Sequence, residues 1–347
     1  MKKENMALYR KYRPETFSDV VGQDHIIKTL ESSIEKGEIV HSYLFSGSRG
    51  IGKTSVARIF ARAIGTSEND INEIDAASNR KIDDARELRD TVSSLPFESP
   101  YKVYIIDEVH MLTREAFNAL LKTLEEPPAH VIFILATTEL HKLPDTIVSR
   151  CQTINFRRPT LATIKEHLIS VAKKEKMDID PEAAYLLSLI ADGSFRDALG
   201  ILQKISSSVS SSKITAKDVE EITGAPSTEL VNGVVSSIVK KDADKGIEIF
   251  RKVQVENYDV KLFFERVIQK IRFVLILKNS PRSGGYVKKE LSEDEYKFVE
   301  SLSKDKDFVF SLDDLKLFLD ALDLCQMSAI KIFPLETAFL DVIKKDQ

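Results

Sequence analysis

The sequence predicts an α/β domain with a parallel sheet, followed by two α-helical domains. Residues 43–62 read as an apolar strand, a Gly-rich loop and a helix. Residues 103–106 and 131–136 are two further apolar runs, and strands buried on both faces are typical of a parallel sheet covered by helices. Beyond Pro159 helical periodicity replaces these strand signals. We therefore expect an α/β domain at 1–158 and helical domains at 159–224 and 225–347.

The loop after the first strand matches the P-loop pattern G-x-x-x-x-G-K-[ST]. Glycines let backbone N–H groups turn around phosphate oxygens, and the following helix adds its positive N-terminal dipole. Lys53 can reach the β- and γ-phosphates, and the Thr54 hydroxyl can ligate Mg²⁺. The pattern therefore predicts a nucleotide-binding protein. The expected phosphate-binding residues are Gly47, Ser48, Arg49, Gly50, Ile51, Gly52, Lys53, Thr54 and Ser55.

The second strand ends in the acidic pair Asp107-Glu108, which downstream of a P-loop is the Walker B arrangement. We expect Asp107 to hold Mg²⁺ through its water shell and Glu108 to orient or deprotonate the attacking water. The alternative is a pair of solvated acids at a strand end. His110 has no clear partner in the sequence and is interpreted as structural.

Three further polar positions follow. The third strand ends in two threonines, and the Thr138 hydroxyl can hydrogen-bond a γ-phosphate or water, although β-branched residues are also common at strand ends. Arg150 is either an exposed charge or a finger that reaches the γ-phosphate of a neighbouring subunit. Ser194 and Asp197 form a capping box that places Arg196 in the first turn of a helix. A cation there opposes the helix dipole, which indicates an anionic partner such as a triphosphate.

The helical segments have readable ends. Apolar residues at 117, 120, 121 and 124 have helical spacing, and the prolines at 127 and 128 end that helix. We expect a loop in the serine-rich stretch 206–212, a linker at 224–226 and a break in the last helical domain near 279–285.

The composition is that of a globular protein, with 43% of its 347 residues hydrophobic and 30% charged. A net charge of −4 and a pI of about 6.0 give no global basic field, so any DNA contact must be local. Cys151 and Cys325 allow no disulfide framework, which favours a reducing cytoplasm. No signal-peptide pattern opens the chain, and the run at 131–136 is too short to span a bilayer. We expect a cytoplasmic protein without membrane contact.

Taken together, these residues resemble the gamma/tau subunit of bacterial DNA polymerase III, an AAA+ clamp-loader ATPase. The resemblance is close from residue 7 to about 224 and looser beyond. Besides the motifs above, it is carried by segments at 8–14, 20–23, 73–80, 107–112, 117–128, 135–138 and 149–151. The segment 117–128, Phe-Asn-Ala-Leu-Leu-Lys-Thr-Leu-Glu-Glu-Pro-Pro, is the most specific of these.

The resemblance implies an AAA+ core that binds ATP and Mg²⁺ and hydrolyses ATP, followed by a helical lid and a helical collar. It implies sensor 1 for Thr138, an arginine finger acting in trans for Arg150, and sensor 2 for Arg196. The adenine and ribose would be cradled by Tyr9, Arg10, Tyr12, Arg13, Pro14, Val20 and Val21.

An assembly is also implied. The collar would join copies of this chain to delta and delta-prime subunits in a ring-like pentamer. ATP binding would let the assembly open a sliding clamp and grip primer–template DNA, and hydrolysis would release the clamp around it. Nucleotidyl transfer would belong to the polymerase complex as a whole. Arg80 and Lys81 are the candidate DNA-phosphate contacts, with a solvated helix face as the alternative.

The sequence departs from the family pattern in two places. Most members carry a cysteine-rich zinc module between the P-loop helix and the segment at 73–80, but residues 63–72 contain no cysteine. Because structural zinc needs about four thiolate or imidazole ligands held close together, we expect no zinc. The chain also ends at Gln347, near the expected end of the collar, without the tail by which the longer tau form binds the helicase and polymerase.

Three other interpretations compete with an ATP-hydrolysing motor. A delta-prime-like stator would share the fold and bind ATP without hydrolysis, but the intact P-loop and the Asp107-Glu108 pair argue against it, because a stator has no need for both. An archaeal or eukaryotic small subunit would also lack zinc, although the segments at 9–14 and 107–112 look bacterial. A DExH helicase would fit the spelling of residues 107–110, but it needs a second α/β core where this sequence is helical.

Overall fold

The computed structural model describes residues 6–78, 92–209, 213–280, 282, 284–305 and 310–344. The chain divides into two compact units, Met1–His167 with Ala191–Gly200, and Leu168–Ile190 with Ile201–Gln347. The sheet of the α/β domain lies in the first unit. The division runs through the predicted middle domain, so the boundaries expected at residues 158 and 224 stay predictions.

The first unit is built on a parallel sheet, as the sequence predicts. Within the described residues it has five strands in the order β2-β3-β4-β1-β5. The strands are β1 (Ser42–Ser46), β2 (Ile71–Asp75), β3 (Lys102–Asp107), β4 (Val131–Thr137) and β5 (Gln152–Asn155). The helices are α1 (Leu8–Lys11), α2 (Asp24–Lys36), α3 (Lys53–Ala63), α5 (Arg114–Glu125) and α6 (Asp145–Val148), with 3-10 turns η2 (Phe17–Asp19), η3 (Glu68–Asp70), η4 (Val109–Met111) and η5 (Leu140–Lys142).

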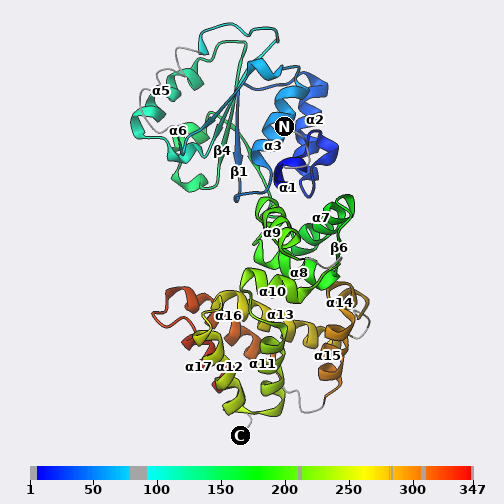
Figure 1. The fold of residues 1–347 in the computed structure, drawn as a ribbon. Helices are drawn as coiled ribbons and strands as arrows, with labels where there is room; N and C mark the ends of the chain where they lie inside the picture. The colour runs from blue at the N-terminus through cyan, green and yellow to red at the C-terminus, as the bar shows by residue number, and fades with distance from the viewer. Residues whose placement is uncertain are drawn as a thin grey trace. The chain divides into compact units, whose positions relative to one another are not determined.

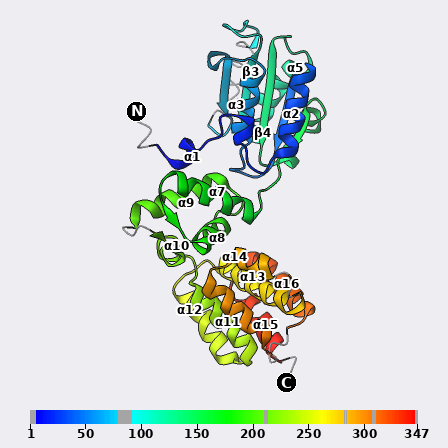
Figure 2. The same cartoon turned by 90° about the vertical axis from the view of Figure 1, so that its right-hand side faces the viewer.

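Helices cover both faces of this sheet (Figures 1 and 2). Alternate residues of a strand point to opposite faces. Tyr43 and Phe45 of β1 therefore pack on the α2 and α3 side, where the Tyr43 ring lies 4.9 Å from the ring of Phe60. Leu44 packs on the other side with Phe117 of α5. Burial on both faces explains why the central strands are continuous apolar runs rather than alternating ones.

The two edge strands, β2 and β5, were not predicted from the sequence. Both are partly exposed and carry polar residues such as Asn72, Glu73 and Gln152, so they lack the apolar run that marks the central strands. Their parallel pairing with β3 and β1 comes from the tertiary fold rather than from a local pattern.

The register brings three functional loops to one edge of the sheet. Ser46 at the end of β1 pairs with Thr137 at the end of β4, and Ile106 near the end of β3 pairs with Leu135. The residues that follow these strands are the P-loop, Glu108 and Thr138. Ligands of open α/β sheets bind at this carboxyl edge.

After β5 the chain is almost entirely helical, as expected. The elements are α7 (Leu161–Lys174), β6 (Asp178–Ile179), α8 (Pro181–Ile190), α9 (Phe195–Ser208), β7 (Lys213–Ile214), α10 (Ala216–Thr223), α11 (Thr228–Lys240), α12 (Ala243–Val255), α13 (Val260–Asn279), α14 (Gly284–Glu290), α15 (Glu293–Lys304), α16 (Leu312–Met327) and α17 (Phe333–Lys344). The short strands β6 and β7 pair in parallel.

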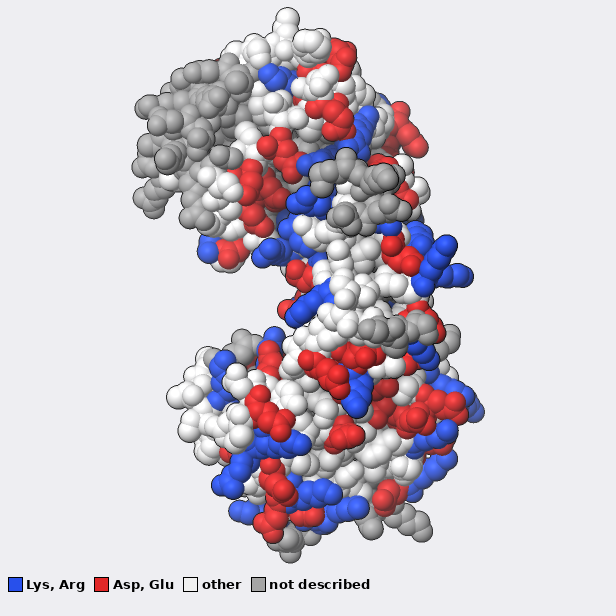
Figure 3. All heavy atoms as spheres, viewed as in Figure 1, with Lys and Arg blue, Asp and Glu red and all other residues white. Residues whose placement is uncertain are grey.

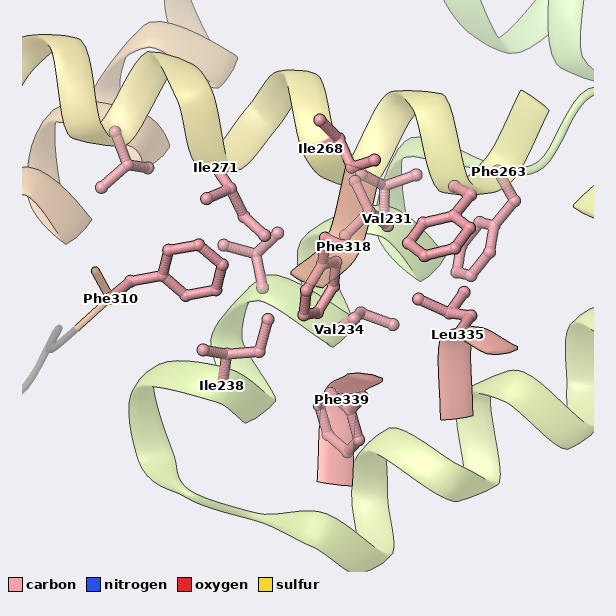
Figure 4. Close-up of a cluster of buried hydrophobic side chains, with 14 of the residues drawn as sticks. Val231, Val234, Ile238, Phe263, Ile268, Ile271, Phe310, Phe318, Leu335 and Phe339 are labelled. Carbon is pink, nitrogen blue, oxygen red and sulfur yellow. The ribbon is translucent and has the colours of Figure 1, made fainter. Parts of the chain in front are cut away.

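The C-terminal helices share one apolar core, centred on the 20-residue helix α13. Its Phe263 and Ile271 point towards Val234 of α11, Phe318 of α16 and Phe339 of α17 (Figure 4). Aromatic rings meet edge-to-face in this core, as between Phe264 and Phe318 at 5.7 Å. The helical region therefore has a core of its own.

One predicted loop is wrong in part. The serine-rich stretch 206–212 does not begin as a loop, because α9 continues to Ser208. The hydroxyls of Ser206 and Ser207 donate to the carbonyl of Gln203, and the hydroxyl of Ser208 donates to the carbonyl of Lys204. These local bonds satisfy the serine side chains within the helix. The break near 279–285 is confirmed, because α13 ends at Asn279. Gly224 ends α10 in the left-handed conformation, but the linker between domains expected at 224–226 stays a prediction.

Charges of both signs are interspersed over the visible face of the C-terminal helices (Figure 3). This distribution agrees with the absence of a global basic field in the composition. Within the described residues, no helix has the length and apolar character needed to cross a bilayer.

Candidate nucleotide site

The P-loop is shaped by glycines with positive φ angles. Gly47, Gly50 and Gly52 have φ values of 145°, 75° and 104°, which L side chains rarely adopt. Gly52 is the N-cap of α3, so the helix N-terminus faces the loop. Lys53 is only 5% exposed, and its Nζ donates to the carbonyls of Gly47 and Ser48 at 2.7 and 2.9 Å. The loop is thus ordered around its own lysine.

The first turn of α9 packs directly on the P-loop. The N–H of Phe195 donates to the carbonyl of Gly50 at 3.0 Å, and a Cβ on Gly50 would collide with Ser194 Oγ. Ser194 Oγ accepts from the N–H of Asp197 at 3.2 Å, which is one of the two bonds of the expected capping box, whereas the N–H of Ser194 donates to the carbonyl of Ala191. Arg196 lies in this turn, so the structure brings it beside the phosphate loop.

The donors for a magnesium ion lie together. Thr54 Oγ1 donates to Asp107 Oδ2 at 2.6 Å. Hydroxyl and carboxylate oxygens are the ligands that Mg²⁺ accepts from proteins when phosphates complete its shell. The glycine cradle, the helix N-terminus and this oxygen pair fit a magnesium–nucleotide complex.

The charges of the site are coupled. The pKa of Lys53 lies below its ordinary value, mainly because the side chain is buried. The negative charges of Glu108 and Asp107 oppose this shift, and the positive charge of Arg196 adds to it. Burial likewise lowers the pKa of Arg13, with Arg58 and Arg196 adding to the effect while Glu73 and Asp107 oppose it. Several cations therefore converge where a polyanion would bind.

Glu108 is held in an unusual conformation. Its φ of 50° and ψ of 43° are left-handed, which costs about 1–2 kcal/mol for an L residue. Its Oε2 accepts from Thr138 Oγ1 at 2.9 Å. The structure therefore brings Thr138 onto the expected catalytic carboxylate.

His110 also belongs to this group, which the sequence did not reveal. Its Nδ1 lies 3.0 Å from Thr137 Oγ1 and 3.4 Å from Glu108 Oε2. The imidazole is 7% exposed and Thr137 is fully buried. Nothing in a single sequence pairs residues 27 positions apart. Only the register of β4 beside β3 brings them together.

The N-terminal segment reaches the P-loop helix through one residue of the predicted adenine cradle. Arg13 Nε donates to Ser55 Oγ at 3.0 Å. Arg10 covers the ring of Tyr9 at 5.7 Å. The roles predicted for Tyr9, Arg10, Tyr12, Pro14, Val20 and Val21 stay predictions.

Arg150 lies at the opposite edge of the sheet. Its carbonyl accepts from Ser42 Oγ at 2.7 Å, and Ser42 begins β1 whereas the P-loop follows its end. Arg150 donates through Nη2 to Glu125 Oε1 at 2.7 Å and through Nη1 to the carbonyl of Thr146 at 2.8 Å. Five strand residues span about 16 Å. Arg150 is therefore not grouped with the P-loop of its own chain.

Two sequence predictions concern other regions. Arg80 and Lys81 lie outside the described residues. In the segment 63–72, α3 ends, η3 forms and β2 begins. Among the described residues there is no group of three or more His, Cys, Asp or Glu side chains placed to hold a metal. The expectation that the chain binds no zinc stays a prediction.

Two family models match the chain. The model described as "DNA polymerase III, delta subunit" matches residues 22–80 and 66–160. The model described as "DNA polymerase III clamp loader subunit, ATPase lid domain" matches residues 163–208.

Curated relatives match over most of this chain. DNA polymerase III subunit tau of Bacillus subtilis is 41% identical over 304 residues, which cover 82% of this chain and 54% of that protein. Subunit tau of Escherichia coli is 36% identical over 80% of this chain and 46% of that protein. The chain thus spans about half the length of these tau relatives. Subunit gamma of Buchnera aphidicola subsp. Baizongia pistaciae is 35% identical over 79% of this chain and 80% of that protein.

A solved structure shows the same fold. The RuvB Holliday junction branch migration motor of Thermotoga maritima superposes with a TM-score of 0.53 at 23% identity, over 66% of this chain and 79% of that one. This likeness shows the fold alone, and the lid domain of the family model covers residues 163–208. The sequence relatives are more specific, since the gamma subunit match extends over four-fifths of that protein. The chain therefore belongs to the gamma/tau family of DNA polymerase III clamp-loader subunits.

Proposed function

We propose that this chain is an ATP-hydrolysing motor subunit of a bacterial clamp loader. Its turnover would drive the opening of a sliding clamp and the loading of that clamp on primer–template DNA, within a DNA polymerase III holoenzyme. The observation that carries the proposal is the hydrogen bond from Thr138 that holds the carboxylate of Glu108, the residue next to the Thr54–Asp107 oxygen pair. A subunit that only binds ATP needs the oxygen pair but has no use for a positioned carboxylate.

Each residue at the carboxyl edge has a role in this proposal. The substrate magnesium–ATP would supply the γ-phosphoryl group that is transferred to water, with ADP as the leaving group. The P-loop N–H groups and Lys53 bind the phosphates, and Thr54 and Asp107 hold the metal. Glu108 orients the attacking water and accepts its proton at a carboxylate oxygen. Thr138 keeps that carboxylate in place through its 2.9 Å hydrogen bond.

Two arginines complete the proposed site. Arg196 would neutralise phosphate charge from the first turn of α9. Arg150 would act on the nucleotide of a neighbouring subunit, which its place at the far edge of the sheet supports. An arginine supplied in trans requires an assembly. The proposed partners are further copies of this chain with delta and delta-prime subunits.

A non-hydrolysing stator is the second candidate. The match of residues 22–160 to a delta-subunit model favours it. Both candidates share the fold and the phosphate loop, so fold similarity does not separate them. The two candidates differ in whether Glu108 acts as the base for ATP hydrolysis.

The test compares Lys53→Ala, Glu108→Gln and the parent chain, each assembled with delta and delta-prime partners. Lys53→Ala should lose turnover because the phosphates lose a cation. Glu108→Gln should retain ATP binding and lose turnover by about 10²-fold or more. Glu38→Gln, at an exposed glutamate next to α2, is the matched control. ATP binding without turnover in every assembly would favour the stator, and parental turnover in Glu108→Gln would refute the catalytic assignment.

A further inference from the structure

The side chain of His110 faces the catalytic edge from the turn η4. Glu108 precedes this turn, so the left-handed backbone at Glu108 sets the directions of both side chains. His110 Nδ1 lies between two oxygens, Thr137 Oγ1 at 3.0 Å and Glu108 Oε2 at 3.4 Å. The imidazole is thus the only described ring that contacts the carboxylate proposed as the base.

The neighbours of Nδ1 decide which ring nitrogen carries the hydrogen. A carboxylate only accepts hydrogen bonds. A lone pair on Nδ1 facing Glu108 Oε2 would therefore be repelled, whereas an N–H there is attracted to both oxygens. Thr137 Oγ1 also accepts from the N–H of Glu139 at 3.0 Å, which fixes the hydroxyl at the end of β4. We assign the hydrogen to Nδ1 from these contacts.

Two donors then converge on one carboxylate oxygen. Thr138 Oγ1 and His110 Nδ1 both face Glu108 Oε2, and both are anchored at the end of strand β4, His110 through Thr137. Among the described residues, no donor contacts Oε1 of Glu108. In this arrangement Oε2 of Glu108 binds protein donors, and Oε1 is available to bind a water molecule.

We propose that His110 is a positioning residue for Glu108, acting through an Nδ1–H that holds one carboxylate oxygen against the end of β4. This role rests on the proposed ATP hydrolysis. It predicts an effect on the rate of the chemical step and not on nucleotide binding, because His110 contacts neither the P-loop nor the Thr54–Asp107 pair among the described contacts.

Two substitutions separate this role from simple packing. In asparagine the side-chain nitrogen is as many bonds from the backbone as Nδ1 of histidine, whereas in glutamine it corresponds to Nε2. Asparagine therefore restores the proposed donor with less volume, and glutamine restores more volume without that donor. If His110 only fills space, kcat of His110→Gln should be at least as high as that of His110→Asn. If His110 positions Glu108, kcat of His110→Asn should be the higher of the two.

The experiment measures steady-state kcat and KM for ATP, ATP affinity and thermal melting for His110→Asn, His110→Gln and the parent chain in the clamp-loader assembly. His141→Gln, at an exposed histidine in η5, is the matched control. We expect His110→Gln to lose about 10-fold or more in kcat, with KM, affinity and melting close to the parent values. His110→Asn should recover most of that loss.

Three results would contradict a positioning role for His110. Equal impairment of His110→Asn and His110→Gln, a loss confined to KM or melting temperature, or kcat values within about twofold of the parent for both variants would overturn the positioning role. Glu108→Gln is measured in parallel. If it too hydrolyses ATP at the parent rate, the proposed function fails. If turnover depends on Glu108 but not on His110, only the present inference fails.

Discussion

The guanidinium of Arg150 is paired with Glu125, the last residue of α5, at 2.7 Å. The pair lies on the side of the sheet where β1 and β5 begin, away from the P-loop. Both side chains are partly exposed, at 36% and 48%. Arg150 therefore remains accessible for a second anionic partner while Glu125 fixes its orientation.

Arg150→Ala should lower ATP hydrolysis only in the assembly. An arginine finger stabilises charge that develops on the phosphates in the transition state, and its loss costs about 10³-fold or more in kcat. Because Arg150 is remote from its own P-loop, ATP affinity of the isolated subunit should stay at the parent value. Turnover and nucleotide binding are measured for the subunit alone and in the complex. An equal loss in both would make Arg150 a local structural residue.

Glu125→Gln should reduce hydrolysis in the assembly by about 10-fold, less than Arg150→Ala does, because the finger loses its charged support but keeps its own charge. Stability should change by less than about 1 kcal/mol, since exposed ion pairs contribute little. The neighbouring exposed residue gives the matched control, Glu126→Gln. Identical rates for the two variants would show that the pairing has no part in catalysis.

The central features of the fold were predictable because each has a local signature. The strands β1, β3 and β4 are apolar runs, and the P-loop spelling specifies both its glycines and its helix. Thr54 and Asp107 were assigned to one metal from their motifs, and the structure joins them at 2.6 Å. For Arg150 and Arg196 the local patterns left alternatives open, and the resemblance to the clamp-loader family added the finger and sensor 2 roles.

What the sequence did not reveal depends on tertiary register. His110 looked unpartnered because Thr137 reaches it only through the pairing of β4 with β3. The edge strands β2 and β5 lack apolar runs, so only their pairing defines them. The composition of the serine-rich stretch 206–212 predicts a loop, but α9 continues to Ser208 and the serine hydroxyls donate to backbone carbonyls of the preceding turn.

Gly50→Ala should weaken nucleotide binding, because it adds strain at a φ of 75° and a collision with Ser194 Oγ. Relief of the collision would move the first turn of α9, which carries Arg196, away from the loop. Gly37→Ala is the matched control, since its φ is 67° but nothing lies within 4 Å of the added Cβ. Strain alone costs about 1–2 kcal/mol of stability in either variant. Equal ATP affinity of the two variants would show that the contact between α9 and the P-loop is not required.

Asp70→Asn should destabilise the first unit in a pH-dependent way. Burial raises the pKa of Asp70, but hydrogen bonds from the N–H groups of Phe97, Glu98 and Ser99 outweigh it and lower the pKa to about 2. The folded pKa lies below the unfolded value of 3.8, so the stabilisation is present above about pH 4 and is lost as the pH falls towards 2. The shift corresponds to about 2 kcal/mol.

Urea unfolding of the parent chain and Asp70→Asn at several pH values measures this difference. The gap between the two proteins should be near its full size at pH 6 and should shrink steadily below pH 4. Asp305→Asn, outside the first unit, controls for the loss of one negative charge. A gap that does not change with pH would mean that the carboxylate charge is not what holds residues 97–99.

The purified chain should contain no stoichiometric zinc. The segment 63–72, where the family resemblance leads us to expect a zinc module, has no cysteine or histidine. Asp70 in this segment instead accepts hydrogen bonds from the backbone N–H groups of residues 97–99. A structural zinc would make stability depend on the metal. Metal analysis should therefore find no stoichiometric zinc, and a chelator should leave the melting temperature unchanged. One tightly held zinc per chain would overturn this prediction.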